Sequence, residues 1–342
     1  PKEVIESLYK ALQDSSNHHY PLDQGIPAFR KKVAGWYKSR FGVTLDPDRE
    51  VLALIGSKEG ISHMPLAFIN PGDVSLVPEP CYPPYKGGTI LAGGLVETMP
   101  LLEKNNFLPD LKNIKKEILK KAKILYINYP NNPTGAACEK GFFEDVVLFA
   151  KKHGIMVAHD AAYSEVAFDG YRPESFLNVN GSKDVGVEFH SLSKTCNMTG
   201  WRIGFVCGNE KIISAIGKVK SNIDSGVFNA IQIAGITALD IAEKHLKKMN
   251  KVYQERRDTL VDGLNSMGWA TRKPKATFYV WTALPKPYKS SIEFAGLVLD
   301  KANIVITPGV GFGESGEGYV RMALTVSKER IREAVARLKT KL

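Results

Sequence analysis

Short apolar segments alternate with longer amphipathic ones between about residue 50 and residue 210. A short apolar run predicts a buried strand, and apolar residues recurring every three or four positions predict a helix. Strands that are apolar on both faces and separated by helices are typical of a mostly parallel sheet covered by helices. The predicted strands are VLALI (51–55), DVSLV (73–77), KILYIN (123–128), IMVAHD (155–160), VEFHSL (187–192) and RIGFVCG (202–208).

The pattern changes after about residue 210, where long helical segments dominate. A continuous helical pattern covers residues 229–267 and is followed by further strand-like segments. Such a mixture of strands and helices, without strict alternation, predicts an α+β unit. The segments concerned are ATFYVWTAL (276–284), NIVIT (303–307) and YVRMAL (319–324), followed by the helical SKERIREAVARLK (327–339).

The two patterns predict two domains. A chain of 342 residues is too long for one ordinary hydrophobic core. We therefore expect a large α/β domain over residues 23–250, with a mostly parallel central sheet, and a small α+β domain over residues 251–342. Residues 1–22 are predicted to form part of the small domain.

Composition narrows the class of protein. No apolar run reaches the roughly 18–20 residues that a membrane-spanning helix needs, and the opening PKEVIESLYKAL reads as an amphipathic helix rather than a signal peptide. The four cysteines are far apart, as is usual for reduced thiols in a cytoplasmic protein. The net charge is +10, but the basic pairs are scattered and no nucleic-acid motif is present. We expect neither a membrane nor a nucleic-acid partner, and expect anionic metabolites as ligands.

Polar residues follow several of the predicted strands at the point where ligands bind in open α/β sheets. Gly56-Ser57-Lys58 opens a helix, where backbone N–H groups attract a phosphate. The other loops contribute Asn132, Asp160 with Tyr163, and Ser191 with Lys194. Each has an ordinary alternative as a helix cap, a turn or an exposed lysine.

Together, these residues match one coenzyme. Pyridoxal 5′-phosphate carries a phosphate, a pyridine nitrogen, a phenolic oxygen and an aldehyde. A lysine forms a Schiff base with the aldehyde, and an aspartate pairs with the pyridinium nitrogen. The set therefore predicts a pyridoxal-phosphate site in which Lys194 is the reactive amine.

Competing motifs are weaker. Residues 311–316, GFGESG, match G-x-G-x-x-G, but a strand-like segment follows them instead of a helix, so we expect a loop. SKT at 193–195 lacks the glycine that precedes the lysine of a phosphate-binding loop. The histidines lack metal-ligand spacing, and no metal is expected.

With these motifs the chain resembles the fold-type I aminotransferases of class I/II over nearly its whole length. The motifs are YPLDQGIPAFR, GSKEG, PGDVSLVPEPCYPPY, NYPNNPTG, HDAAYSE, SLSKTCNMTGWRIGF and YVRMAL. The segments around residues 56–60, 128–135 and 191–204 look most similar to the bacterial LL-diaminopimelate and aspartate-like aminotransferases.

The resemblance implies a role for each matching residue. Lys194 would hold the coenzyme and move the substrate proton, while Asp160 would keep the pyridine nitrogen protonated. The resemblance also implies Tyr163 and Asn132 at the phenolic oxygen, Tyr82 stacked on the ring, and Ser57, Lys58, Ser191 and Arg202 at the phosphate. In a homodimer with shared active sites, Tyr20 would reach the partner's phosphate and Asn229 would also approach from across the interface. Arg321, with Asn132 nearby, would bind the substrate α-carboxylate, because a planar guanidinium fork suits a carboxylate.

The resemblance implies amino transfer between an L-amino acid and a 2-oxo acid, with LL-diaminopimelate or an aspartate-like donor and 2-oxoglutarate as the best guess. A β-lyase or decarboxylase on the same fold, or a catalytically silent relative, remains open. The family usually has an N-terminal arm that closes over substrate, and this sequence begins at a helix like the one after it. Selection of the substrate side chain is therefore left unassigned.

Overall fold

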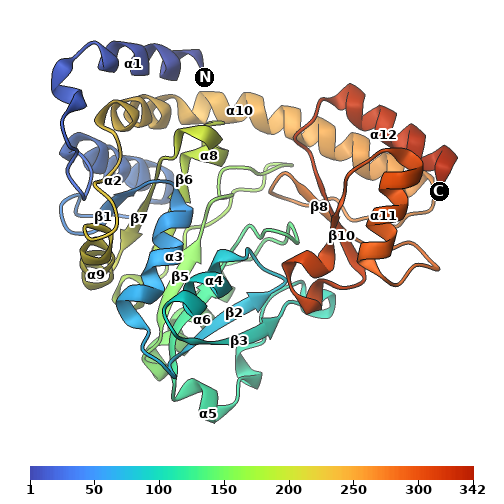
Figure 1. Ribbon diagram of the computed structural model, residues 1–342, viewed down its shortest axis with the longest axis horizontal. Helices are drawn as coiled ribbons and strands as arrows, with labels where there is room; N and C mark the ends of the chain where they lie inside the picture. The colour runs from blue at the N-terminus through green and yellow to red at the C-terminus, as the bar shows by residue number, and fades with distance from the viewer.

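The computed structural model describes residues 1–342, and its main body is a seven-stranded sheet in the order β1-β7-β6-β5-β4-β2-β3 (Figure 1). A second sheet has three strands in the order β8-β10-β9. The strands are β1 (Val51–Leu54), β2 (Val74–Glu79), β3 (Leu95–Pro100), β4 (Ala122–Ile127), β5 (Met156–Asp160), β6 (Gly186–Ser191), β7 (Gly204–Gly208), β8 (Tyr279–Ala283), β9 (Thr307–Pro308) and β10 (Tyr319–Ala323).

Twelve α-helices and several short 3₁₀ turns surround these sheets. The helices are α1 (Lys2–Leu12), α2 (Pro27–Phe41), α3 (Ser57–Phe68), α4 (Pro84–Leu91), α5 (Lys116–Leu119), α6 (Lys140–His153), α7 (Ser182–Val185), α8 (Leu192–Thr195), α9 (Glu210–Lys220), α10 (Asn229–Ser266), α11 (Ser291–Ala302) and α12 (Lys328–Lys341). The 3₁₀ turns are η1 (Ser15–His18), η2 (Glu103–Asn105), η3 (Leu111–Asn113), η4 (Phe176–Asn178), η5 (Thr199–Trp201), η6 (Gly309–Phe312) and η7 (Glu314–Gly316). None of the helices is long and apolar enough to cross a membrane.

Helices cover both faces of the large sheet, as its apolar strands require. One face joins a core of 38 buried residues that includes Phe29 of α2 and Phe143 of α6. The other face joins a core of 17 buried residues that includes Ile61 of α3 and Ile212 of α9. The predicted α/β class with a mostly parallel central sheet is confirmed.

Strand direction brings the polar loops to one edge of the sheet. The pairs β2–β3, β2–β4, β4–β5 and β5–β6 are parallel, whereas β6–β7 and β7–β1 are antiparallel. Two successive antiparallel pairings restore the direction, so β1 runs the same way as β6. The helix start after β1, the ends of β5 and β6, and the segment that enters β7 therefore lie at the same edge.

The C-terminal part has its own core, beside the large sheet. Twenty buried residues form it, and they include Val280 of β8, Phe294 of α11 and Ile331 of α12. The 38-residue helix α10 runs along both parts of the molecule (Figure 1). Its first half contributes Leu239 to the main core, and its second half contributes Leu260 to the C-terminal core.

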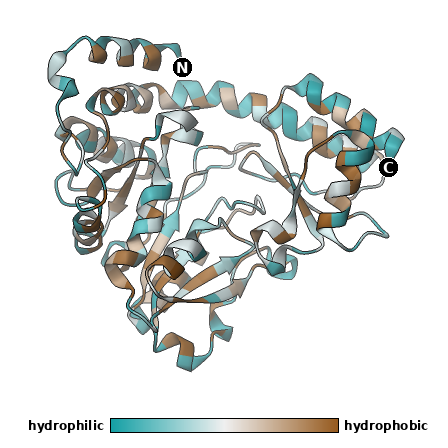
Figure 2. Cartoon of the chain, viewed as in Figure 1, coloured by the Kyte–Doolittle hydropathy of each residue, from teal (hydrophilic) through white to brown (hydrophobic).

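Helix α1 does not join the C-terminal core. Val4 belongs to the main core, and Thr237 in the first half of α10 donates a hydrogen bond to Ser7 at 2.9 Å. Hydrophobic and hydrophilic residues alternate along α1, as expected for an amphipathic helix lying on α10 (Figure 2). The predicted assignment of residues 1–22 to the small domain is not supported by these contacts.

Four segments differ from the sequence-based expectations. The prediction of a strand at NIVIT was wrong for residues 303–306. Helix α11 ends there, with Asn303 in a left-handed conformation, and only Thr307–Pro308 form a strand, β9. Strand β3 was missed because it is a largely exposed edge strand without an apolar run. Helix α11 was also missed. The RIGFVCG strand begins two residues later than predicted, at Gly204.

Candidate active site

A cavity of about 330 Å³ lies between the edge of the large sheet and the small sheet. Ten of the twelve residues predicted for the site line it, together with Pro83, Ala162, Ser193, Tyr279 and Phe312. The ten are Ser57, Lys58, Tyr82, Asn132, Asp160, Tyr163, Ser191, Lys194, Arg202 and Arg321.

Tyr20 and Asn229 do not line this cavity. Tyr20 is 89% exposed in the single chain. Asn229 is the first residue of α10, and its Oδ1 is buried without a hydrogen-bond partner. Neither residue therefore reaches the cavity of its own subunit.

One wall of the cavity is built around the start of α3. Gly56 precedes the helix with φ +75° and ψ 154°, and a Cβ there would lie 2.3 Å from Nη2 of Arg202. Glycine is therefore required both by the backbone conformation and by the close approach of the guanidinium. Arg202 itself follows η5 in a left-handed conformation, φ 55°, and its Nη1 donates to the Thr199 carbonyl oxygen at 2.8 Å.

Ser57 and Ser191 complete this wall. Ser57 is buried as the first residue of α3, where backbone N–H groups lack intrahelical partners. Ser191 ends β6, and its Oγ accepts the Ser193 N–H at 3.2 Å. An anion-binding wall is thus formed by two hydroxyls, a guanidinium and the N-terminus of the 12-residue helix α3. Lys58 also lines the cavity, although it is an exposed residue.

Asp160 is a buried carboxylate at the end of β5. Its Oδ2 accepts the Tyr85 hydroxyl at 2.8 Å, its Oδ1 accepts the Ala162 N–H at 3.2 Å, and Asn128 holds its backbone oxygen at 2.6 Å. Burial raises the pKa of Asp160, and the hydrogen bonds from Tyr85 and Ala162 only partly oppose this. None of these hydrogen-bond partners is cationic, so Asp160 can pair with a protonated ring nitrogen of a ligand.

Lys194 sits on the short helix α8, directly after β6. Burial lowers the pKa of its amine, and the positive charges of Arg202 and Arg321 lower it further, while Asp160 opposes them. A larger fraction of the amine is therefore unprotonated at neutral pH than in an exposed lysine. An unprotonated amine is the nucleophilic form, which is the state that covalent chemistry at this residue requires.

Arg321 reaches the cavity from β10 of the small sheet. Its Nη1 donates to Oδ1 of Asn132 at 2.8 Å. Its guanidinium carbon lies 4.0 Å from the ring centroid of Tyr279 and 4.5 Å from that of Phe312. Two aromatic rings therefore fix the plane of the guanidinium, and its buried Nε has no hydrogen-bond partner. Such an oriented fork with free donors suits a carboxylate.

Tyrosines form the remaining surface. The Tyr163 hydroxyl donates to the Tyr279 hydroxyl at 3.2 Å. This hydrogen bond connects the loop that follows β5 to strand β8. Tyr82 packs edge-on against Tyr85, with ring centroids 5.9 Å apart. Burial raises the pKa of Tyr82 and of Tyr163, so both phenols are neutral hydrogen-bonding groups at physiological pH.

A second cluster of ionisable residues lies within strands β5 and β6 of the large sheet, outside the cavity. Glu188 is fully buried, with its Oε1 at 3.3 Å from Nδ1 of His159 and 3.6 Å from Nε2 of His190. Its Oε2 accepts the Leu177 N–H at 3.0 Å and the hydroxyl of Ser175. Because the histidines directly precede Asp160 and Ser191 in β5 and β6, the cluster stabilises the strand ends that carry site residues.

Sequence reasoning missed Tyr85, Tyr279 and Phe312. Tyr85 stands in the quoted PEPCYPPY segment, where only its neighbour Tyr82 was assigned. Tyr279 and Phe312 carry no local signal, because a strand aromatic and a loop aromatic are usually core residues. Their proximity to Arg321 follows from the pairing of β8 with β10 and from the position of η6.

The charges of the cavity fit a doubly anionic occupant. Three cationic side chains (Lys58, Arg202 and Arg321) line it beside the amine of Lys194, whose pKa is lowered, against the single carboxylate of Asp160. A phosphate beside Arg202 and a carboxylate beside Arg321 would balance this excess. A ring between them would place a basic nitrogen at Asp160, so the residues present fit pyridoxal phosphate together with an amino-acid substrate.

Comparison with known proteins agrees with this chemistry. The family model for aminotransferase class I and II matches residues 1–338. An LL-diaminopimelate aminotransferase of Desulforudis audaxviator is 55% identical over 339 residues, covering 99% of this chain and 86% of that protein. The substrate-bound BacF structure from Bacillus subtilis superposes with a TM-score of 0.97 at 39% identity, covering 99% of this chain and 86% of that chain. An aminotransferase from Staphylococcus aureus superposes with a TM-score of 0.95 at 35% identity, covering 99% of this chain and 90% of that chain. The chain therefore belongs to the class I and II aminotransferases and is a pyridoxal-phosphate-dependent transaminase.

Proposed function

We propose that this enzyme transfers the amino group of LL-diaminopimelate to 2-oxoglutarate. The donor is suggested by the name of the relative that is 55% identical over 99% of the chain. The observation that carries amino-acid binding in general is the position of Arg321 in the same cavity as Lys194, hydrogen-bonded to Asn132 and flanked by two aromatic rings. Every amino acid and 2-oxo acid presents the α-carboxylate that this group would bind.

The residues of the large sheet's edge would hold the coenzyme. Ser57, Ser191 and Arg202 would bind its phosphate, with Lys58 adding a partly exposed positive charge. Asp160 would pair with the ring nitrogen, Asn132 and Tyr163 would lie at the phenolic oxygen, and Tyr82 would cover the ring face and exclude water. When bound, pyridoxal phosphate supplies the aldehyde that takes up the amino group and the ring that withdraws electrons from the α-carbon.

Lys194 would move the proton. Its lowered pKa lets Nζ act as a base toward the substrate Cα–H, and the same nitrogen can return the proton on the coenzyme side. Arg321 and Asn132 would orient the substrate so that this bond faces Nζ. Tyr85 supports the step indirectly, because its hydroxyl orients the Asp160 carboxylate.

We also propose a homodimer in which each subunit completes the other's site. Tyr20 is almost fully exposed, and the buried Asn229 Oδ1 has no partner within the chain. Both are polar groups suited to a ligand or a neighbouring subunit, and neither serves the cavity of its own chain. Analytical ultracentrifugation tests the dimer, and a Tyr20→Phe variant with weakened coenzyme binding would support the shared site.

The proposed domains are residues 23–250 and 251–342, joined within α10. The main core ends along this helix at Leu246, and the C-terminal core begins at Tyr253, which supports a boundary near residue 250. We propose a cytoplasmic location, since all four cysteines are buried free thiols.

Two experiments test the proposed function. Borohydride reduction of the coenzyme-loaded enzyme, followed by peptide mapping, should place the coenzyme on Lys194. A donor screen with 2-oxoglutarate should then yield glutamate from LL-diaminopimelate faster than from aspartate, alanine or aromatic amino acids, without release of ammonia or carbon dioxide. A label on another lysine would refute the role of Lys194, and a different preferred donor would refute the proposed substrate.

A further inference from the structure

Residues 309–316, GVGFGESG, form a loop of the small sheet that touches the large one. The loop contains η6 and η7 and lies just before β10. Its ends are closed against each other, since a Cβ on Gly309 would lie 2.0 Å from the Gly316 oxygen. We call it the glycine loop. Its compact backbone makes it a rigid unit rather than a flexible connection.

Three hydrogen bonds attach the glycine loop to the large sheet. Oε2 of Glu79 accepts the Ser315 N–H at 3.1 Å and the Ser315 hydroxyl at 2.9 Å. The Cys81 N–H donates to the Phe312 oxygen at 2.9 Å. Glu79 is the last residue of β2, so these contacts tie the loop to the sheet edge that carries the site.

Glu79 is held in its ionised form for this contact. It is 6% exposed, and Lys86 binds its second oxygen, Oε1. Burial alone would raise the pKa of Glu79, but hydrogen bonds from Lys86 and Ser315 lower it below its usual value. Gly313 allows the close approach, because at φ +120° its Cβ would lie 2.5 Å from Oε1 of Glu79.

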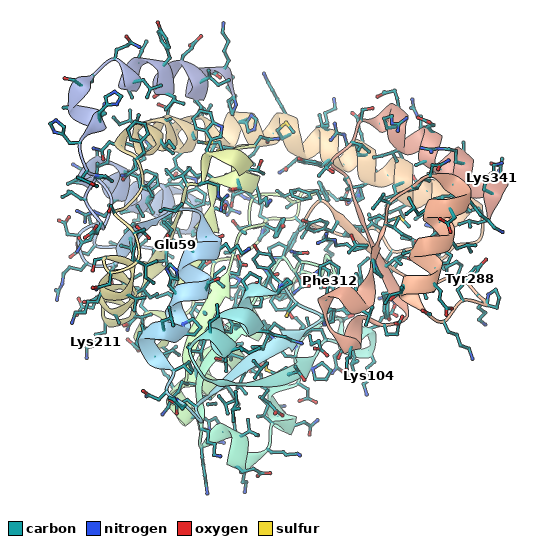
Figure 3. All side chains as sticks on the ribbon, in the orientation of Figure 1. Glu59, Lys104, Lys211, Tyr288, Phe312 and Lys341 are labelled. Carbon is teal, nitrogen blue, oxygen red and sulfur yellow. The ribbon has the colours of Figure 1, made fainter.

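The glycine loop presents Phe312 to Arg321. In Figure 3, Phe312 lies on the side of the C-terminal part that faces the large sheet. Its ring centroid lies 4.5 Å from the Arg321 guanidinium carbon, and Tyr279 of β8 makes a second contact with the same guanidinium at 4.0 Å. The contact Glu79–Ser315 and the contact Phe312–Arg321 therefore belong to the same rigid loop.

We propose that Glu79 is a positioning residue, which fixes the glycine loop so that Phe312 orients Arg321 and thereby sets the affinity for the substrate α-carboxylate. The inference rests on the proposed role of Arg321. Loosening the loop should weaken the binding of every amino acid and 2-oxo acid alike, because all of these substrates carry the α-carboxylate. The proton-transfer residues lie on other elements, so the turnover number should change little.

The test compares three variants with the wild-type enzyme. Glu79→Ala removes the acceptor, and Gly313→Ala introduces a Cβ where the carboxylate of Glu79 lies. Glu314→Gln is the matched control, since Glu314 is an exposed acid of the same loop whose side chain makes no ion pair or hydrogen bond. If Glu79→Ala folds poorly, Ser315→Ala removes only the hydroxyl donor and serves in its place.

Two measurements are made on the coenzyme-loaded enzyme with its best donor. In Glu79→Ala and Gly313→Ala we expect KM for the donor and for the 2-oxo acid to rise by about tenfold, as for loss of a charged hydrogen bond, with kcat within about twofold. Deuterium uptake of the peptide covering residues 309–316 should rise in both variants and stay unchanged in Glu314→Gln.

Two outcomes would overturn the proposal. Increased deuterium uptake with unchanged KM values would mean that the contact only joins the two parts of the chain. A fall in kcat at constant KM would mean that Glu79 acts elsewhere. The Arg321→Lys variant tests the proposed role of Arg321 separately. If Arg321 does not bind the α-carboxylate, this variant will leave KM unchanged. A donor other than LL-diaminopimelate does not affect the comparison.

Discussion

Nη1 of Arg321 donates a hydrogen bond to Oδ1 of Asn132 at 2.8 Å, across 189 positions of sequence. Asn132 belongs to the loop after β4 in the large sheet, and Arg321 belongs to β10 in the small one. The loop around Asn132 is itself fixed, because its N–H is held by Oδ1 of Asn128 at 2.8 Å. The bond therefore sets the distance between the two walls of the cavity.

Replacement of Arg321 by lysine should weaken binding of both substrates. Lysine keeps the charge, but it cannot form a two-pronged contact or stack flat between Tyr279 and Phe312. We expect KM for the amino donor and for the 2-oxo acid to rise by about 10- to 100-fold, as for loss of a charged hydrogen bond. Steady-state kinetics at varied donor and acceptor checks this, and unchanged KM values would contradict the proposed carboxylate contact.

Replacement of Lys194 by alanine should abolish turnover while the fold is retained. The side chain lies at a cavity wall rather than in a core, and loss of a proton-transfer group costs about 10²- to 10⁴-fold or more in rate. Lys194→Arg is the informative partner variant, because it keeps the positive charge but does not lose its proton. Both variants should show wild-type circular dichroism and negligible amino transfer. Normal turnover in either one would exclude the assigned role.

Gly56→Ala should impair coenzyme binding more than stability. The new Cβ would meet Arg202 at 2.3 Å, and the strain of a non-glycine residue at this positive φ would lower the free energy of unfolding by about 1–3 kcal/mol. Gly42→Ala is a useful control, because Gly42 also has a positive φ, +73°, with nothing within 4 Å. Titration with pyridoxal phosphate should show a raised Kd for Gly56→Ala alone. Equal Kd values in the two variants would refute the role of the Gly56–Arg202 contact.

The pKa of Lys194 should respond to its charged neighbours with opposite signs. Burial is the largest cause of its lowered pKa, so neither change below restores the usual value. Arg202→Met removes a repelling cation and should raise the pKa, which shifts the reactive amine to higher pH. Asp160→Asn removes an attracting anion and should lower it. The rate of reductive methylation of Lys194 against pH, in coenzyme-free protein, measures both shifts.

Glu188 should make the fold sensitive to acid. Burial by itself would raise its pKa, but the close approach of His159 and His190 to its Oε1 holds the pKa well below the usual glutamate value. A carboxyl whose folded-state pKa is depressed adds stability above its unfolded pKa, near 4.3, and this stability is lost as the pH falls below that value. Glu188→Gln should therefore lower the free energy of unfolding at neutral pH, by about 1–3 kcal/mol for buried polar partners left without their acceptor. The substitution should also make the free energy of unfolding depend less on pH in the acid range. Urea unfolding of both proteins between pH 7 and pH 3 measures this.

The positions of the large sheet's strands and of its polar loops could be predicted from the chain alone. Apolar runs before Gly56, Asn132, Asp160 and Lys194 are local patterns, and the carboxyl edge of an open sheet gathers whatever follows its strands. Edge strand β3 and helix α11 escaped this reading. The first is too exposed to show an apolar run, and the second went unassigned beside the strand-like segment that follows it.

What the sequence determined by itself was the chemistry of the site, because residue type and order along the chain specify which groups can bind phosphate, pair with a ring nitrogen or lose a proton. Only the tertiary structure decided how Arg321 is held. Asn132, Tyr279, Phe312 and Glu79 meet around it through strand pairing and the docking of the glycine loop. Those contacts join segments far apart in sequence, and such contacts depend on packing geometry that no local pattern of residues encodes.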